Sequence, residues 1–485
     1  METQSRHQGR FWTTAALITA APLLLSLCWA MWTAPYPISE TVGLMELAGV
    51  MPDPHPAAHD GIDPVLRNIF STTARSWYRP FFHLTWYILW HATGSLSATL
   101  LLFRVLEVAS VASLILLLLW WLRPKSFLDY AAATFAVAVL LGTPGLRENL
   151  EIPMLMTLVA MPMVMIVWML LERSPHRAWH SAVIVLLTMI AIGYKEQGLV
   201  LLPVIVAAWW TRAPGASRVT MAATAVLVLA YLAFRFSTTG AWQPFEQDVG
   251  LGFGGLSAGE ASSRFGAFPY WMYLYNAAST VGNILLSEPT WGVFRIVRDI
   301  RDAKVASWEI NELASSAVLT ALVIWWAVRT WRREAGTPWS VETRLVVVTV
   351  FAIAASGALG FNYSRDRMGG MAVVFLAIAA YFAVRAAGER IALQTSRVRA
   401  TVAALCLMLL AGAWQIRAMG TIDSVRLRAA KVHRNWIAGL QQRRVDYAGH
   451  PQYLRILNGM AQQGFEPVAA SLYPDWAQAI LGGEP

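Results

Sequence analysis

Long apolar runs, separated by short polar segments, are the dominant pattern along this chain of 485 residues. A helix needs about 20 consecutive apolar residues to cross the ~30 Å hydrocarbon core of a bilayer. Runs that reach or nearly reach this length lie at 11–32, 98–122, 127–143, 152–171, 179–194, 198–210, 218–236, 311–329, 345–361, 368–385 and 400–416. The pattern therefore predicts an all-α polytopic membrane protein with about eleven transmembrane helices.

Two further apolar runs, 78–93 and 270–287, are short, aromatic and interrupted by His, Asn or Gly. Their placement can be derived from the rule that short cytoplasmic loops collect Lys and Arg. If the N-terminus is cytoplasmic and both runs are juxtamembrane helices at the outer face, every second connection is basic. These basic residues are Arg123, Lys125, Arg173, Arg177, Arg212, Arg218, Arg329, Arg332, Arg333, Arg344, Arg385, Arg390, Arg397 and Arg399. We therefore expect a cytoplasmic N-terminus and an extracytoplasmic C-terminus.

This topology divides the chain into a transmembrane domain, 1–416, and a small extracytoplasmic tail, 417–485. The outer side of the transmembrane domain carries a first loop at 33–77 and a long loop at 237–309. The first apolar run follows basic residues, as a signal peptide does, but it is long enough to span and has no evident small-residue cleavage site. We expect this run to be retained as the first helix.

Composition supports a membrane protein, because 56% of the residues are hydrophobic and only 14% are charged. The net charge of +9 comes from the short loops, without the zinc spacing or aromatic-basic stripe that would favour a nucleic-acid partner. Both cysteines, Cys28 and Cys406, lie inside apolar runs, so they indicate neither a disulfide framework nor a metal site. The outward C-terminus and the uncleaved first helix suit a prokaryotic inner (plasma) membrane, and an endoplasmic reticulum would give an equivalent topology.

Charged residues on the predicted outer side break the charge rule in three separate turns. An ionisable residue at the edge of the hydrocarbon costs a few kcal/mol or more unless it has a partner or a wet cavity. A carboxylate there can take a proton from an acceptor hydroxyl, and fixed cations can stabilise a phosphate leaving group. The alternative is that these charges only pair with one another locally. They are Arg147, Glu148 and Glu151, then Lys195 and Glu196, then Arg365, Asp366 and Arg367.

The first outer loop is acidic, with Glu40, Asp60 and Asp63 among its carboxylates. It also contains His55 and His59, but two histidines in a Pro-containing loop are too little to define a metal site. We therefore assign no metal ligand and leave a divalent cation open.

Five short motifs follow one another on the predicted outer side. They are Pro37-Ile38-Ser39-Glu40-Thr41, Trp77-Tyr78-Arg79-Pro80-Phe81-Phe82, Leu150-Glu151-Ile152-Pro153, Gly193-Tyr194-Lys195-Glu196-Gln197-Gly198 and Asn362-Tyr363-Ser364-Arg365-Asp366-Arg367. In this order, over roughly residues 11–385, the chain resembles the GT-C superfamily of polyprenyl-phosphate-sugar glycosyltransferases. It is most similar to the branch of the protein O-mannosyltransferases and lipid A aminoarabinose transferases (glycosyltransferase family 39).

The resemblance implies a GT-C-like helix bundle and a membrane hexosyltransferase. Such an enzyme moves a sugar, for example mannose, from a polyprenyl-phosphate donor to an acceptor hydroxyl on a lipid, glycan or protein, with inversion. Glu40 stands where the family has the second residue of an Asp-Glu motif, but Ser39 replaces the first acid. The general base is therefore Glu40, Asp60 or Asp63, and an inactive or repurposed relative is an alternative. Glu151 replaces the family's second aspartate and is expected to position donor or acceptor.

The remaining site residues fall into two groups. Those expected to bind the donor phosphate are Lys195, Arg365, Arg367, Arg79 and Arg104. Those expected to contact the rest of the substrate are Tyr78, His83, Glu196 and Tyr363. Arg104 and Glu107 are equally consistent with a buried ion pair.

Two other functions use the same residues differently. A transporter or flippase of an anionic lipid or solute would use the cations without a catalytic base, although we find no internal repeat of the kind common in transporters. A non-catalytic assembly subunit of a glycan pathway would be consistent with Ser39 at the expected aspartate position.

Overall fold

The computed structural model describes residues 2–33, 80–93, 96–151, 156–173, 177–239, 263, 271–287, 299–333, 339–361 and 366–446. Within these ranges the chain forms helices and no strand, which confirms the all-α prediction. The helices are α1 (Glu2–Thr33), α4 (Pro80–Thr93), α5 (Leu96–Leu122), α6 (Phe127–Gly142), α7 (Pro144–Glu151), α8 (Met156–Arg173), α9 (Ala178–Tyr194), η1 (Glu196–Val200), α10 (Leu201–Trp210), α11 (Arg218–Thr239), α13 (Trp271–Leu286), α15 (Ser307–Arg333), α16 (Val341–Leu359), η2 (Asp366–Gly369), α17 (Gly370–Ala392) and α18 (Arg397–Asp446).

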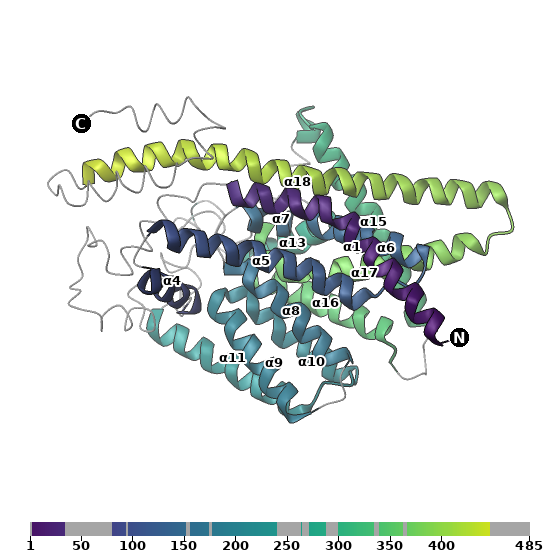
Figure 1. Ribbon diagram of the computed structural model, residues 1–485, viewed down its shortest axis with the longest axis horizontal. Coiled ribbons are helices and arrows are strands. Elements are labelled where there is room, and N and C mark those ends of the chain that lie inside the picture. The colour runs from purple at the N-terminus through teal and green to yellow at the C-terminus, as the bar shows by residue number, and fades with distance from the viewer. Residues whose placement is uncertain are drawn as a thin grey trace.

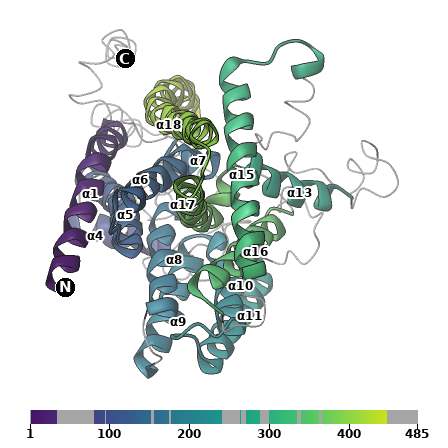
Figure 2. The ribbon, with the colours of Figure 1, turned by 90° about the vertical axis from the view of Figure 1, so that its right-hand side faces the viewer.

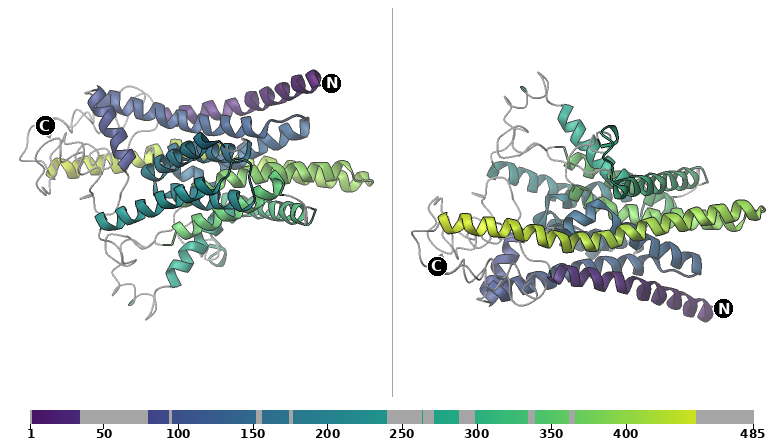
Figure 3. Two further views of the ribbon diagram at one scale, coloured as in Figure 1. Left: turned by 90° about the horizontal axis from the view of Figure 1, so that it is seen from below. Right: turned by 90° about the horizontal axis from the view of Figure 1, so that it is seen from above.

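The long helices form one bundle along a common direction (Figure 1). The first residues of α1 and the connection between α17 and α18 lie at the same end of the bundle, and the C-terminal end of α18 lies at the other (Figure 3). We call the first the basal end and the second the distal end. The basal end is the one predicted to face the cytoplasm.

The core of the bundle is built around α17, which packs against α6, α8, α15, α16 and α18 (Figure 2). Every residue from Gly370 to Tyr381 in this helix is buried, and many of its buried residues are alanine. Small side chains let neighbouring helix backbones approach closely, which is how helices associate where lipid removes the hydrophobic driving force. An alanine-rich central helix is therefore suited to a bundle that sits in a membrane.

All eleven predicted apolar runs coincide with helices. Among the described residues, six helices are long and apolar enough to cross a membrane, and α6 with α7 makes a seventh if this pair, bent by 60°, is one span. The apolar helices at Thr157–Glu172, Ala178–Tyr194, Glu196–Trp210 and Arg218–Phe234 are shorter, at 10–17 residues. A multi-pass membrane protein is thus supported, and the number of eleven crossings stays a prediction.

The two short runs predicted to lie at the interface form α4 and α13. In α4, Phe81 packs directly on Gly193 at the end of α9, where any larger residue would overlap the phenyl ring. The Thr85 hydroxyl also lies 2.6 Å from the Tyr194 hydroxyl. Gly193 is therefore the contact that lets α4 dock on the end of α9.

The last helix, α18, runs without a break across the predicted domain boundary between residues 416 and 417. Buried residues follow that boundary, among them Arg417, Ala418, Thr421 and Val425. The packed bundle therefore includes residues beyond 416. The outward location of the tail stays a prediction, and residues 447–485 lie outside the described part of the chain.

Candidate functional site

The first of the three charged turns is a break between α6 and α7. Thr143 has an extended backbone (φ −78°, ψ 139°), as expected for a residue that precedes a proline. Pro144 then begins α7, because proline is well tolerated in the first turn of a helix but not in its interior. The break bends the chain by 60° and turns the polar residues of α7 toward the bundle, where Glu148 and Asn149 are buried.

The second turn lies between α9 and η1. Lys195 leaves the helix in an extended conformation, and its buried ammonium group lies 3.0 Å from the carboxylate of Glu196. The Gly198 N–H donates to the Lys195 carbonyl at 2.8 Å and closes the turn. Local ion pairing, the alternative to a phosphate-binding role, is thus present for this pair.

The third turn, η2, packs directly on α7. The backbone N–H of Arg367 donates to Glu148 Oε2 at 2.8 Å, and Asn149 Nδ2 donates to the Arg367 carbonyl at 3.4 Å. Gly145 makes this approach close, because a Cβ atom there would lie 3.3 Å from the Asp366 carbonyl oxygen. The glycine in α7 therefore lets two polar backbone segments meet side by side.

The second and third turns also meet. Gln197 of η1 is fully buried, and its Nε2 donates to the sulfur of Met368 in η2 at 3.4 Å. The structure thus brings together the three turns that the charge pattern placed on one side of the membrane. At their junction, Arg367 Nε is buried without a hydrogen-bond partner among the described residues.

Sequence reasoning missed the part that α13 has in this junction. Its buried face is polar, whereas Leu274 on the other side is 75% exposed. Asn276 Nδ2 donates to the Phe361 carbonyl at 3.0 Å, and Asn283 Nδ2 donates to Asp366 Oδ1 at 2.9 Å. These two asparagines therefore bind Phe361 and Asp366, the described residues that flank positions 362–365 in the sequence, where two predicted site residues lie. The signal was available, since the buried polar positions of α13 follow helical spacing in an otherwise apolar run: Asn276, Ser279, Thr280 and Asn283.

A second cluster that sequence reasoning missed lies beside α7. Arg147 pairs with Glu312 of α15 at 2.5 Å. The buried guanidinium of Arg417 donates to the Gly142 carbonyl at the end of α6 through Nε (3.2 Å) and Nη2 (3.0 Å). Its other contacts are the hydroxyls of Ser287 (2.6 Å), Ser315 (3.0 Å) and Ser316 (2.6 Å) and the carbonyl of Glu312 (3.0 Å). Arg417 therefore joins α18 to the α6–α7 break, to the end of α13 and to α15.

The other predicted site residues are distributed as follows. Arg104 of α5 donates to the carbonyls of Met31 and Trp32, so it holds the last turn of α1. Glu107 is buried one turn further along α5, and its pairing with Arg104 stays a prediction. His83 lies in α4 and Glu151 ends α7, and their side chains lie outside the described part. Seven more lie wholly outside it: Glu40, Asp60, Asp63, Tyr78, Arg79, Tyr363 and Arg365.

The described residues add no candidate metal site to those considered from the sequence. Within the residues that the structure describes, no group of three His, Cys, Asp or Glu side chains is placed to hold a metal ion. The acidic first loop lies outside those residues, so a divalent cation stays open.

Comparison of the chain with protein-family models, with curated proteins and with solved structures finds no match in any of the three. The resemblance to the GT-C superfamily therefore rests on the motifs and their order alone.

The contact between Glu148 and η2 leads to a prediction. Replacing Glu148 by alanine should speed amide hydrogen exchange at Arg367 about tenfold or more, because a hydrogen bond to a charged acceptor contributes about 1.5–3 kcal/mol. Mass spectrometry of peptides that cover η2 measures this rate. The control is Asp423→Ala, at a carboxylate on α18 that is 67% exposed. Unchanged exchange in the Glu148 variant would show that this carboxylate does not hold η2.

Proposed function

We propose that this chain is an inverting membrane glycosyltransferase that transfers a hexose from a polyprenyl-phosphate donor to an acceptor hydroxyl. The observation that carries the proposal is the guanidinium of Arg367 at the junction of three turns, with a buried N–H donor that no described residue accepts. A buried donor of this kind implies an acceptor such as water or a bound anion. Arginine is well suited to phosphate oxygens, because its planar fork presents several N–H groups at once.

In the proposed reaction the acceptor hydroxyl gives its proton to Glu40, or to Asp60 or Asp63. The hydroxyl oxygen attacks the anomeric carbon as the bond from that carbon to the phosphate oxygen breaks. The lipid phosphate leaves with the bonding electrons, and attack from the opposite side inverts the anomeric centre. Fixed cations lower the barrier because negative charge develops on the leaving phosphate.

The cations contribute unequally in this scheme. Arg367 lies in the turn η2, which α7 and α13 contact, and Arg365 precedes this turn in the sequence, so we assign these two arginines as the principal phosphate ligands. Lys195 lies 3.0 Å from Glu196, and this pairing screens its charge. We therefore assign Lys195 a secondary contact with the phosphate, while Glu151 positions donor or acceptor.

The direct test is transfer of radiolabel from a polyprenyl-phosphate hexose in membranes that contain the chain, over several sugars and against membranes without it. We expect label in the acceptor fraction and an equal amount of released polyprenyl phosphate. Movement of the intact donor between leaflets without label transfer would favour a flippase. Neither transfer nor movement, with the protein folded and present, would favour an assembly subunit.

A further inference from the structure

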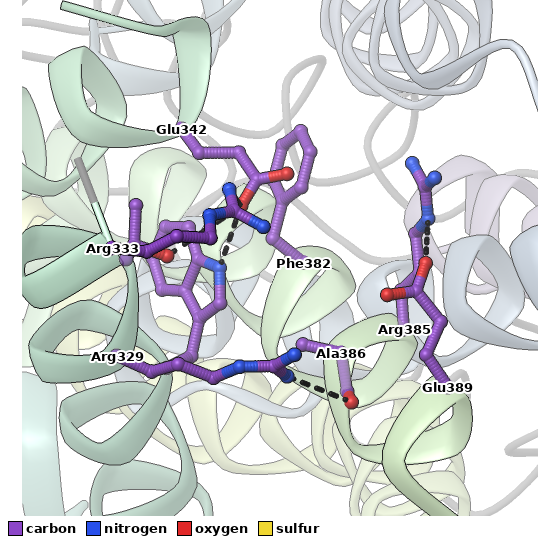
Figure 4. Close-up of a pocket in the computed structure, with 9 residues that line it drawn as sticks. Arg329, Arg333, Glu342, Phe382, Arg385, Ala386 and Glu389 are labelled. Carbon is purple, nitrogen blue, oxygen red and sulfur yellow. Dashed lines mark hydrogen bonds and ion pairs between the residues drawn. The ribbon is translucent and has the colours of Figure 1, made fainter. Parts of the chain in front are cut away.

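A cleft lies at the basal end of the bundle, at the other end from the three charged turns. Figure 4 shows the side chains that line it. The cleft lies between the last turns of α15, the first turn of α16 and the C-terminal half of α17. Three guanidinium groups line it, from Arg329, Arg333 and Arg385. Three cations from two helices thus converge around one opening, instead of spreading along a single helix end.

The carboxylates in the cleft are already engaged. Glu342 lies 3.6 Å from Arg333 and accepts a hydrogen bond from Trp326 Nε1 at 3.3 Å. Arg385 lies 3.1 Å from Glu389 and 3.2 Å from Asp129 of α6. Arg329 differs, since its hydrogen bond among the described residues goes to the Ala386 carbonyl at 3.4 Å. Of the three arginines, Arg329 is therefore the one whose charge no described carboxylate neutralises.

A cavity of about 230 Å³ adjoins the cleft and shares Phe382 and Arg385 with it, and the carboxylate of Glu172, which pairs with Arg344 at 2.6 Å, also lines it. Trp121 and Leu122 line this cavity, and Phe382 stacks on Trp326 with ring centres 5.8 Å apart. A cationic opening with apolar surface beside it matches a molecule that has a charged head and a hydrocarbon chain.

We propose that this basal cleft binds the phosphate group of an anionic lipid headgroup, with Arg329 as the main ligand and Arg333 and Arg385 beside it. Basic pockets between transmembrane helices on the cytoplasmic side are suited to such headgroups, because anionic lipids are enriched in that leaflet. The site is separate from the proposed catalytic junction and lies at the other end of the same helices. Inorganic phosphate has the same chemistry as the headgroup, so the test must distinguish the two.

Native mass spectrometry of the purified full chain tests the proposal. Phosphatidylglycerol should bind more tightly than phosphatidylcholine with the same acyl chains. Arg329→Gln should weaken phosphatidylglycerol binding about tenfold, the value of one charge-assisted hydrogen bond to phosphate. Arg332→Gln is the matched control, because Arg332 is an exposed neighbour on α15 that does not line the cleft. Equal thermal unfolding of both variants would show that neither is misfolded.

Competition with inorganic phosphate distinguishes a lipid headgroup from free phosphate as the ligand of the cleft. Binding of phosphatidylglycerol that needs Arg329 and resists millimolar phosphate would assign the cleft to a lipid. If millimolar phosphate displaces the lipid, and binding of phosphate also needs Arg329, the cleft is a phosphate site whose ligand is a free anion. Equal binding of the two lipids, or equal losses in the Arg329 and Arg332 variants, would overturn the proposal.

Discussion

Replacing Arg417 by methionine is expected to lower the free energy of unfolding by about 3–5 kcal/mol. Methionine keeps much of the side-chain volume but removes every N–H donor of the guanidinium. The Gly142 carbonyl at the end of α6 and the hydroxyl of Ser287 would then be buried without this donor. Thermal unfolding of the purified protein in detergent, followed by fluorescence, measures the change.

The control for this variant lies on the same helix. Arg426 pairs with Asp423 three residues earlier at 3.6 Å, and their side chains are 48% and 67% exposed. A pair of this kind contributes about 0–1 kcal/mol, so Arg426→Met should leave the unfolding midpoint nearly unchanged. Arg417→Lys should fall between the two, because one ammonium group cannot reach acceptors on three helices. Equal shifts for methionine at 417 and 426 would show that the Arg417 contacts do not stabilise the bundle.

Replacing the proposed base and the proposed phosphate ligand should abolish most sugar transfer. We expect Glu40→Gln to lower the rate about 10²–10⁴-fold, the usual contribution of a positioned general base. Arg365→Ala should lower it about 10²–10³-fold, because one donor to the charge that develops on the phosphate is lost. Transfer from the radiolabelled donor, at equal protein levels, measures both effects.

Each outcome of this experiment assigns a role. Asp423→Asn, at an exposed carboxylate of α18, controls for general effects of charge removal and should keep the wild-type rate. Transfer that survives in Glu40→Gln alone would move the base to Asp60 or Asp63. Transfer that survives in Arg365→Ala would contradict the assignment of the phosphate to this turn.

The positions of the helices could be predicted from the sequence, because an apolar run about as long as a membrane span indicates a helix over the same residues. The sequence was less informative where a helix is interrupted or extended. The apolar run 127–143 ends with α6, but the polar segment that follows it forms the helix α7, and Arg417 follows an apolar run as if it began a soluble tail. The burial of α7 and of Arg417 depends on packing between segments far apart in the chain, which hydropathy along the sequence does not report.

The site could be predicted in outline and not in its contacts. Because spans that alternate in direction bring every second connection to one side, the three charged turns were expected together, and they are. The partners that fix them were not predictable: Arg147 and Glu312 are 165 residues apart, and Asn283 and Asp366 are 83 apart. Pairings at such separations depend on which helices are neighbours, and one sequence does not determine that.

The helix α18 is longer than a bilayer is thick. Its 50 residues measure about 75 Å at 1.5 Å per residue, whereas a bilayer with its headgroups is about 40–45 Å thick. The last buried side chain described on this helix is Val425, and the helix continues to Asp446. The final stretch therefore reaches about 30 Å further, roughly the diameter of a small domain. The helix α18 is therefore long enough to cross a bilayer and to continue beyond it.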